Sequence, residues 1–160
     1  MLNEQLHQEI AEKLLACFDQ RTQLPLLTAT YPEIEVEDAY RIQERVVAGL
    51  VAGGRRVRGY KIGLTSKPMQ ELAGTTEPDY AAILDDMFLD ESSAVPRADF
   101  LSPLVEIELA FVMGGELRGP GVNVADVIRA TAFVLPAIEV VDFRVAPGPG
   151  MDVRDTIADL

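Results

Sequence analysis

The segment 105–113 places a large apolar side chain at every second residue, and this period of two constrains the fold more than any other feature of the chain. Every second residue is large and apolar: Val105, Ile107, Leu109, Phe111 and Met113. The residues between them begin with two acids, Glu106 and Glu108. Successive side chains of a β-strand point to opposite faces of a sheet, so a period of two predicts a strand whose acids share the face opposite the apolar residues.

Helical periodicity supplies the other half of the expected architecture. Apolar residues at helical spacing predict long helices over residues 3–20 and 36–50. Shorter helices are expected after Ser66 and after Asn123, because serine and asparagine favour helix N-termini.

Two further segments, residues 57–64 and 133–143, are predicted to be strands, whereas residues 75–82 are predicted to form a loop. We therefore expect an α+β fold in a single domain. An N-terminal helical region is expected over residues 1–56, followed by a mixed, β-rich core over residues 57–160.

Charge and hydropathy exclude several classes of protein. The 160 residues include 26 acids and 14 bases, a formal net charge of −12. This balance argues against binding to nucleic acid, since phosphate contacts need an excess of basic charge. No segment approaches the ~18 apolar residues of a membrane-spanning helix, and the first residues do not resemble a signal peptide. We therefore expect a cytoplasmic protein that contacts neither nucleic acid nor membrane.

The chain contains one histidine, His7, and one cysteine, Cys17, both in the first predicted helix. Structural zinc needs about four such ligands, and we expect His7 to be exposed rather than catalytic. Cys17 lies on the apolar stripe of its helix and is expected to be a buried packing residue. Any chemistry must therefore come from carboxylates, lysines, tyrosines and a metal.

Three carboxylates could form a metal site. Glu106 and Glu108 are predicted to lie about 6.5–7 Å apart on one strand face, and Glu139 stands in an otherwise apolar strand. Oxygen ligands alone suit Mg²⁺, Mn²⁺ or Ca²⁺. The spacing leaves a second interpretation open, in which the strand face is simply solvated and Glu139 pairs with an arginine.

Lys61 shares its predicted strand face with Gly59 and Gly63, so no neighbouring side chain on that strand crowds it. The surrounding segment, residues 53–70, contains bases but no acid and could receive an anionic substrate. A basic edge strand that resists aggregation is the alternative. Asp79 follows a proline, where local sequence favours a turn or cap.

Seven segments in order resemble the 2-keto-4-pentenoate hydratase / 2-oxohepta-4-ene-1,7-dioate hydratase family of the fumarylacetoacetate hydrolase-like superfamily. They are Tyr31–Tyr40, Gly59–Lys67, Glu77–Tyr80, Leu84–Phe88, Glu106–Val112, Leu135–Glu139 and Asp155–Asp159. The resemblance covers nearly the whole chain. It implies a divalent metal, Mg²⁺ or alternatively Mn²⁺, held by Glu106, Glu108 and Glu139. It also implies that Lys61 and Asp79 transfer protons or orient water.

The implied activity is that of a hydro-lyase. Water adds to a 2-hydroxydienoate or 2-oxo-4-enoate, such as 2-oxohepta-4-ene-1,7-dioate or 2-oxopent-4-enoate, to give a 4-hydroxy-2-oxo acid in meta-cleavage catabolism of aromatic compounds. The resemblance further implies a homo-oligomer that could associate with the sister decarboxylase.

Family members continue for more than half this length again, so we expect a C-terminally truncated core with open strand edges. Two alternatives to the hydratase remain. One is a 4-oxalocrotonate-type decarboxylase, and the other is an inactive fragment that acts only as an interaction module.

Overall fold

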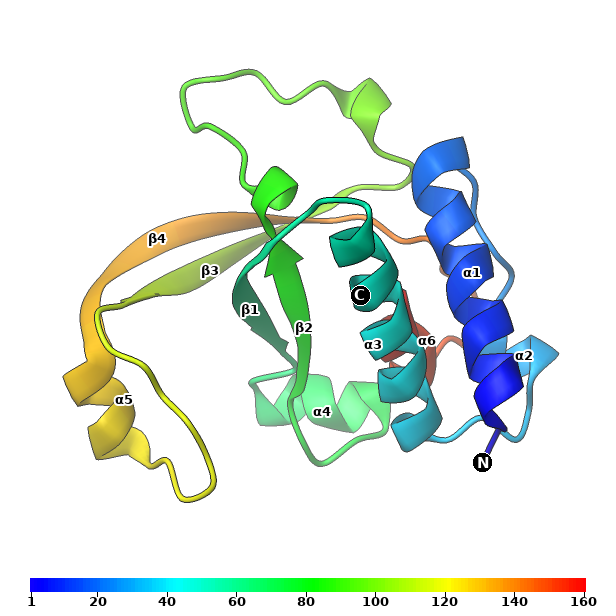
Figure 1. Cartoon of the computed structure of the whole chain (residues 1–160), viewed down its shortest axis with the longest axis horizontal. Helices are drawn as coiled ribbons and strands as arrows, with labels where there is room; N and C mark the ends of the chain where they lie inside the picture. Colours follow the sequence, from blue (N-terminus) through cyan, green and yellow to red (C-terminus); the bar gives the residue numbers. More distant parts are fainter. The chain divides into compact units, whose positions relative to one another are not determined.

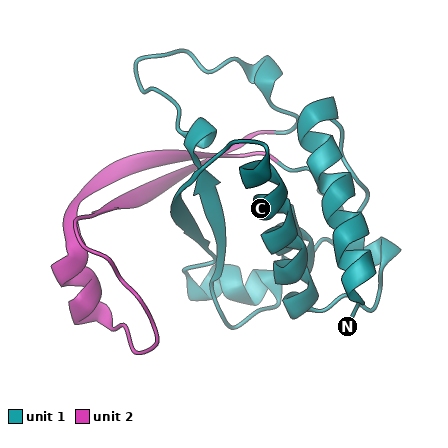
Figure 2. Cartoon of the chain, in the orientation of Figure 1, with its two compact units in different colours: residues 1–102, 143–160 teal, residues 103–142 magenta.

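The computed structural model describes all 160 residues, and packing divides the chain into two compact units (Figure 2). Unit 1 comprises residues 1–102 and 143–160, and unit 2 comprises residues 103–142. Helices are combined with two antiparallel, two-stranded sheets, which confirms the α+β class. The boundary expected at residue 57 stays a prediction. No helix has the length and apolar character needed to cross a membrane.

Four helices build the core of unit 1. The two long ones, α1 (Glu4–Gln20) and α3 (Val36–Ala52), confirm the predicted helices and lie side by side (Figure 1). The short helices α2 (Leu27–Thr30) and α6 (Val153–Asp159) contact each other, and α6 also packs on α3. The buried residues of this core include Ile10, Leu14, Ala39, Ile42, Val46, Leu84, Val145, Ile157 and Ala158.

The prediction that His7 is exposed was wrong, because α3 covers its side of α1. Only 5% of His7 is exposed, and its Nε2 lies 2.8 Å from Oδ1 of Asp38 on α3. The same carboxylate accepts hydrogen bonds from the amides of Leu2 and Glu35. Burial raises the pKa of Asp38, but the hydrogen bonds from Glu35, His7 and Leu2 outweigh it and hold this pKa below its usual value. Cys17 is buried, as predicted.

Replacing Asp38 with alanine is expected to lower the free energy of unfolding by about 3–5 kcal/mol at neutral pH, because buried donors lose their acceptor. The pKa of Asp38 is lowered on folding, so its contribution is present above the unfolded pKa and is lost as pH falls through the folded value. Urea denaturation at pH 7 and in acid should show this difference shrinking. The exposed neighbour Glu37 provides the control: E37Q should change stability by at most about 0.5 kcal/mol.

A β-hairpin and a short helix complete unit 1. Strand β1 (Val57–Gly63) pairs antiparallel with β2 (Asp79–Leu84), and α4 (Lys67–Ala73) connects them. Helix α4 begins after Ser66 and ends at Gly74, whose φ of 70° is a left-handed value that glycine adopts without strain. Two 3₁₀ turns, Asp85–Met87 and Arg97–Asp99, follow β2.

Strand β2 corrects the loop predicted over residues 75–82. Both Ala81 and Ala82 are buried although they point to opposite faces of the strand. A strand covered on both sides has no alternation between apolar and polar residues, so its sequence carries no period of two. The pairing with β1 and the packing beside α6 determine this strand, and neither is visible locally in the sequence.

Unit 2 is a two-stranded ribbon with a helix in its connection. Strand β3 (Leu104–Met113) pairs antiparallel with β4 (Thr131–Val141), and α5 (Val124–Ala130) precedes β4. Asn123 caps α5 through hydrogen bonds from the amides of Ala125 and Asp126, as expected. Each strand of a two-stranded sheet is an edge strand, which explains why β4 accommodates Pro136.

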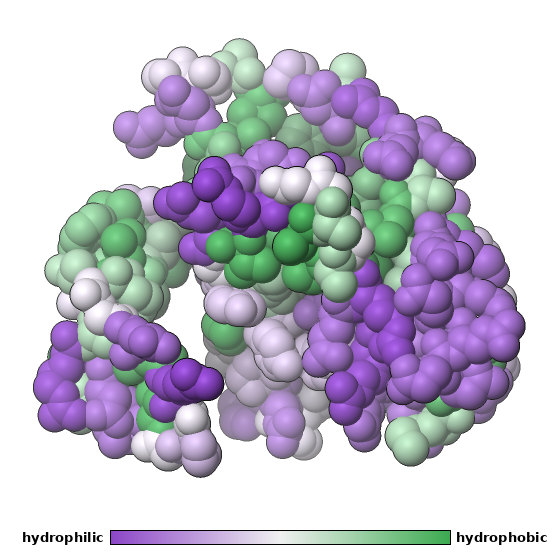
Figure 3. All heavy atoms as spheres, viewed as in Figure 1, coloured by the Kyte–Doolittle hydropathy of each residue, from purple (hydrophilic) through white to green (hydrophobic).

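The two faces of the ribbon differ in chemistry. One face is entirely apolar; the pairing places on it Val105, Ile107, Leu109 and Phe111 from β3 opposite Val140, Ile138, Pro136 and Val134 from β4. Ile107 is 90% exposed, and green atoms gather over the ribbon in Figure 3. The alternation thus predicts the strand and its apolar face correctly, but unit 2 contains no second layer that buries this face.

Candidate metal centre and lysine hairpin

The opposite face of the ribbon brings the three predicted carboxylates together. Glu106 stands directly opposite Glu139 in the β3–β4 ladder, and Glu108 lies two residues further along β3 on the same face. One ligand oxygen from each of the three side chains lies within 4.8 Å of the others. The sequence predicted that Glu106 and Glu108 share a face, but only the pairing register places Glu139 across from them.

This arrangement is unfavourable without a cation. Like charges that stand directly opposite each other destabilise a strand pair, and a third carboxylate adds to the repulsion. Exposed carboxylates are common without any metal, so the exposure of these side chains is not evidence for a metal site. The convergence of three oxygen donors on one face is the feature that fits a hard divalent ion such as Mg²⁺ or Ca²⁺. Three protein ligands leave coordination positions open for water or substrate.

Lys61 and Asp79 lie on one face of the β1–β2 hairpin. Lys61 is paired with Ala81, and Gly63 is paired with Asp79, so the lysine and the aspartate are diagonal neighbours across the ladder. Both side chains are half-buried. Asp79 begins strand β2 rather than forming a turn. The lysine and aspartate belong to unit 1 and the three glutamates to unit 2, so each group is assembled within its own unit.

The other face of the hairpin packs toward α3. Tyr80 stacks on Tyr40 with ring centroids 4.8 Å apart, and burial raises the pKa of Tyr40. The side chain of Gln43 donates hydrogen bonds to the backbone carbonyls of Tyr80 and Ile157. Gln43 therefore ties β2 and α6 to α3, a role that the sequence did not signal. A hollow of about 280 Å³ remains between α3 and this face of the hairpin.

The acids of the segment 155–159 stabilise the fold instead of extending the site. Asp155 accepts hydrogen bonds from the amide and the hydroxyl of Thr28. Asp159 accepts from the amides of Arg144 and Val145 and lies 2.8 Å from the Arg144 guanidinium. Burial nevertheless raises the pKa of Asp159. These contacts join α6 to α2 and to Arg144 and Val145, which precede α6 in the chain. They explain why two aspartates are buried in this helix.

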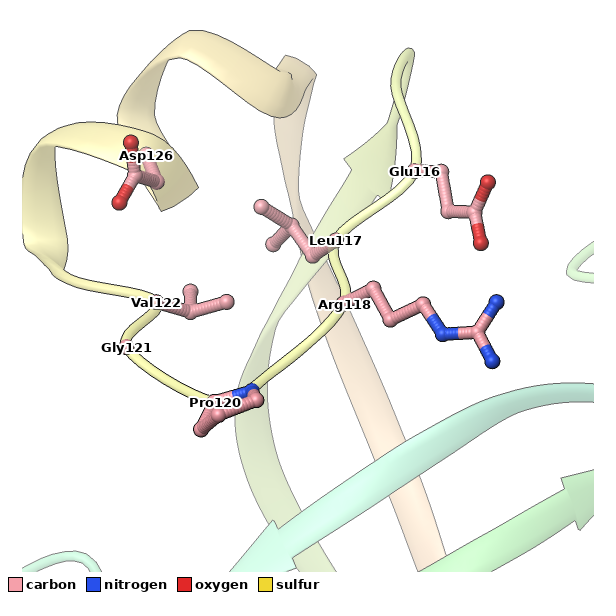
Figure 4. Close-up of a pocket in the computed structure, with 7 residues that line it drawn as sticks. All are labelled: Glu116, Leu117, Arg118, Pro120, Gly121, Val122 and Asp126. Atoms are coloured by element: carbon pink, nitrogen blue, oxygen red, sulfur yellow. The ribbon is translucent and has the colours of Figure 1, made fainter.

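A second hollow, of about 320 Å³, lies in the connection between β3 and α5 (Figure 4). Figure 4 shows the side chains of Leu117 and Val122 inside this loop, while the Arg118 guanidinium points away from it. None of the three clustered glutamates lines the hollow. It has no connection to the carboxylate cluster that would assign it a function.

The chain is similar to two kinds of known protein, hydratases in sequence and a decarboxylase in structure. The 2-oxo-hept-4-ene-1,7-dioate hydratase of Escherichia coli is 45% identical over 144 residues, which cover 90% of this chain and 54% of that protein. The 2-hydroxypent-2,4-dienoate hydratase of Pseudomonas putida is 38% identical over 159 residues, covering 99% of this chain and 71% of that protein. No model of a protein family matches the chain.

A solved structure with the same fold is 4-oxalocrotonate decarboxylase from Pseudomonas putida G7, complexed with magnesium and adipate. It superposes with a TM-score of 0.92 at 28% identity, over 99% of this chain and 60% of that one. The same enzyme was also solved with calcium and acetate. The chain therefore spans little more than half the length of the E. coli hydratase and of this decarboxylase.

Proposed function

This chain belongs to the 2-keto-4-pentenoate hydratase / 2-oxohepta-4-ene-1,7-dioate hydratase family, with the fumarylacetoacetate hydrolase-like fold, and we propose that it carries the metal site and proton-transfer groups of a hydratase. The observation that carries this proposal is the convergence of Glu106, Glu108 and Glu139 on one face of the β3–β4 ribbon. The proposed substrate is a 2-hydroxydienoate or its 2-oxo-4-enoate form, and the proposed product is a 4-hydroxy-2-oxo acid.

The three glutamates are proposed to hold Mg²⁺, with Mn²⁺ as an alternative. The donor set fits such an ion because all three ligands are carboxylate oxygens and no soft ligand is present in the cluster. The magnesium and calcium found with the solved relative support this choice of metal class. When bound, the ion would supply Lewis-acid chemistry to the carboxylate and keto oxygens of a 2-oxo acid.

Lys61 and Asp79 are proposed to move protons between water and the substrate carbons, or to orient the water that adds. Net hydration places a hydroxyl on C4 and leaves the 2-oxo group intact, so protons must be both delivered and removed. A lysine beside a carboxylate on the same hairpin face can serve as such a pair. Their half-buried environment limits access of bulk water to both groups.

Decarboxylation is the second candidate reaction, favoured by the fold of the solved relative. That relative is only 28% identical to this chain, whereas the two hydratases are 45% and 38% identical. Identity therefore favours hydration. Cytoplasmic location, a homo-oligomer and association with a sister decarboxylase remain part of the proposal.

Turnover by the purified 160-residue protein tests the proposal directly. Freshly generated 2-hydroxydienoates would be supplied with Mg²⁺ or with a chelator, and the product identified by mass. We expect a Mg²⁺-dependent gain of one water. Mg²⁺-dependent loss of carbon dioxide would reassign the chain to the decarboxylase. A chain that binds Mg²⁺ but neither hydrates nor decarboxylates the supplied 2-hydroxydienoates would be an inert fragment. The hydratase proposal for these 160 residues would then fail.

A further inference from the structure

The two glycines that flank Lys61 have different surroundings. A Cβ atom added at Gly63 would lie 2.1 Å from Oδ1 of Asp79 and 3.1 Å from its Cγ. A Cβ atom added at Gly59 would meet nothing within 4 Å. Both glycines belong to β1 and share the face of Lys61. The carboxylate of Asp79 therefore occupies the space that a side chain at position 63 would fill.

Backbone conformation does not explain the glycine at position 63. The glycines with left-handed φ values are Gly54, Gly74, Gly121 and Gly150. Gly63 is absent from that group and lies in regular ladder pairing with Asp79. An L-residue can adopt this strand conformation. What the missing Cβ provides is room for the carboxylate.

We propose that Gly63 is a positioning residue for Asp79: its lack of a side chain lets the carboxylate lie over the backbone of β1, on the face that also presents Lys61. This inference rests on the proposed function, in which Asp79 takes part in proton transfer. An alanine at position 63 would displace the Asp79 carboxylate by rotation of its side chain. The strand can accept the methyl group, because the atom in its way is the tip of a rotatable side chain rather than backbone.

The matched variants G63A and G59A separate positioning from a general effect on the hairpin. Both add one methyl group to the same face of β1, two residues from Lys61. We expect G63A to lower kcat by about 10–100-fold with KM changed less than twofold, since displacement of a catalytic group by about 1 Å can cost 10² in rate. G59A should keep the kcat and KM of the original chain. Melting temperatures should be similar for both variants.

A second measurement does not depend on turnover. The ¹³C chemical shift of the Asp79 side-chain carboxyl carbon, assigned with D79N, would be compared at pH 7 in the metal-free original chain and in both variants. We expect the signal to move in G63A and to stay in place in G59A. An unmoved signal in G63A would overturn the positioning role even if the chain proved inactive. If the original chain turns over substrate and G63A matches G59A in kcat, the inference also fails, while the proposed function stands.

Discussion

Replacing Glu106 with glutamine is expected to weaken Mg²⁺ binding by more than about 100-fold and to abolish turnover. Changing residues that merely support a ligand typically costs 10–100-fold in metal affinity, and the loss of a charged ligand should cost more. Glu106 stands opposite Glu139 in the ladder and shares its strand face with Glu108, and one oxygen from each of the three side chains lies within 4.8 Å of the others. Isothermal titration with Mg²⁺ and steady-state kinetics would measure the two effects.

Glu116 supplies the matched control for this variant. It is an exposed acid of unit 2 outside the carboxylate cluster, so E116Q removes the same charge and should leave Mg²⁺ affinity unchanged. Without metal, E106Q should stabilise the chain by about 0.2–1 kcal/mol, because one of three repelling charges is gone. Unaltered turnover in E106Q would remove the metal assignment of this cluster.

Replacing Lys61 with methionine is expected to lower kcat by about 10²–10⁴-fold while Mg²⁺ affinity is retained. Methionine keeps most of the length and apolar character of the lysine stem but has no proton to donate. Loss of a general acid or base typically costs this much in rate. Lys61 contributes no oxygen ligand, so the metal should still bind to the three glutamates. Kinetics and Mg²⁺ titration on the same preparation separate the two properties.

Lys13 provides the comparison for Lys61. It lies on α1, where its ammonium group donates a hydrogen bond to the Tyr31 hydroxyl. K13M removes the same charge from unit 1 and should preserve kcat. A K61M protein that turns over normally would exclude Lys61 from proton transfer. Equal losses of kcat and Mg²⁺ affinity would instead show that Lys61 acts through the metal centre.

Local sequence patterns predicted most of the regular structure. The period of two over residues 105–113 led to β3, and helical spacing led to α1 and α3, because each of these elements buries or presents a single face. The caps Ser66 and Asn123 marked the beginnings of α4 and α5. In each case the pattern or cap that predicts the element lies within the element or directly beside it.

The predictions failed where contacts between distant segments decide the outcome. Strand β2 was predicted as loop because it is covered on both sides and so lacks alternation. His7 was placed on the surface because its partner Asp38 lies 31 residues away. Helix α6 was not among the predicted elements, and its buried acids are stabilised by Thr28 and Arg144 from other segments.

For the candidate site, the sequence by itself determined the residue types, the shared face of Glu106 and Glu108, and the face of Lys61 with its two glycines. These follow from the period of two in an extended chain, which is visible in a single segment without knowledge of the strand it pairs with. Only the tertiary structure decided that Glu139 stands opposite Glu106, that Asp79 shares the hairpin face of Lys61, and that Gly63 alone of the two glycines makes room for its carboxylate. The register between strands depends on which residues pair across the ladder, and that is a property of the folded chain.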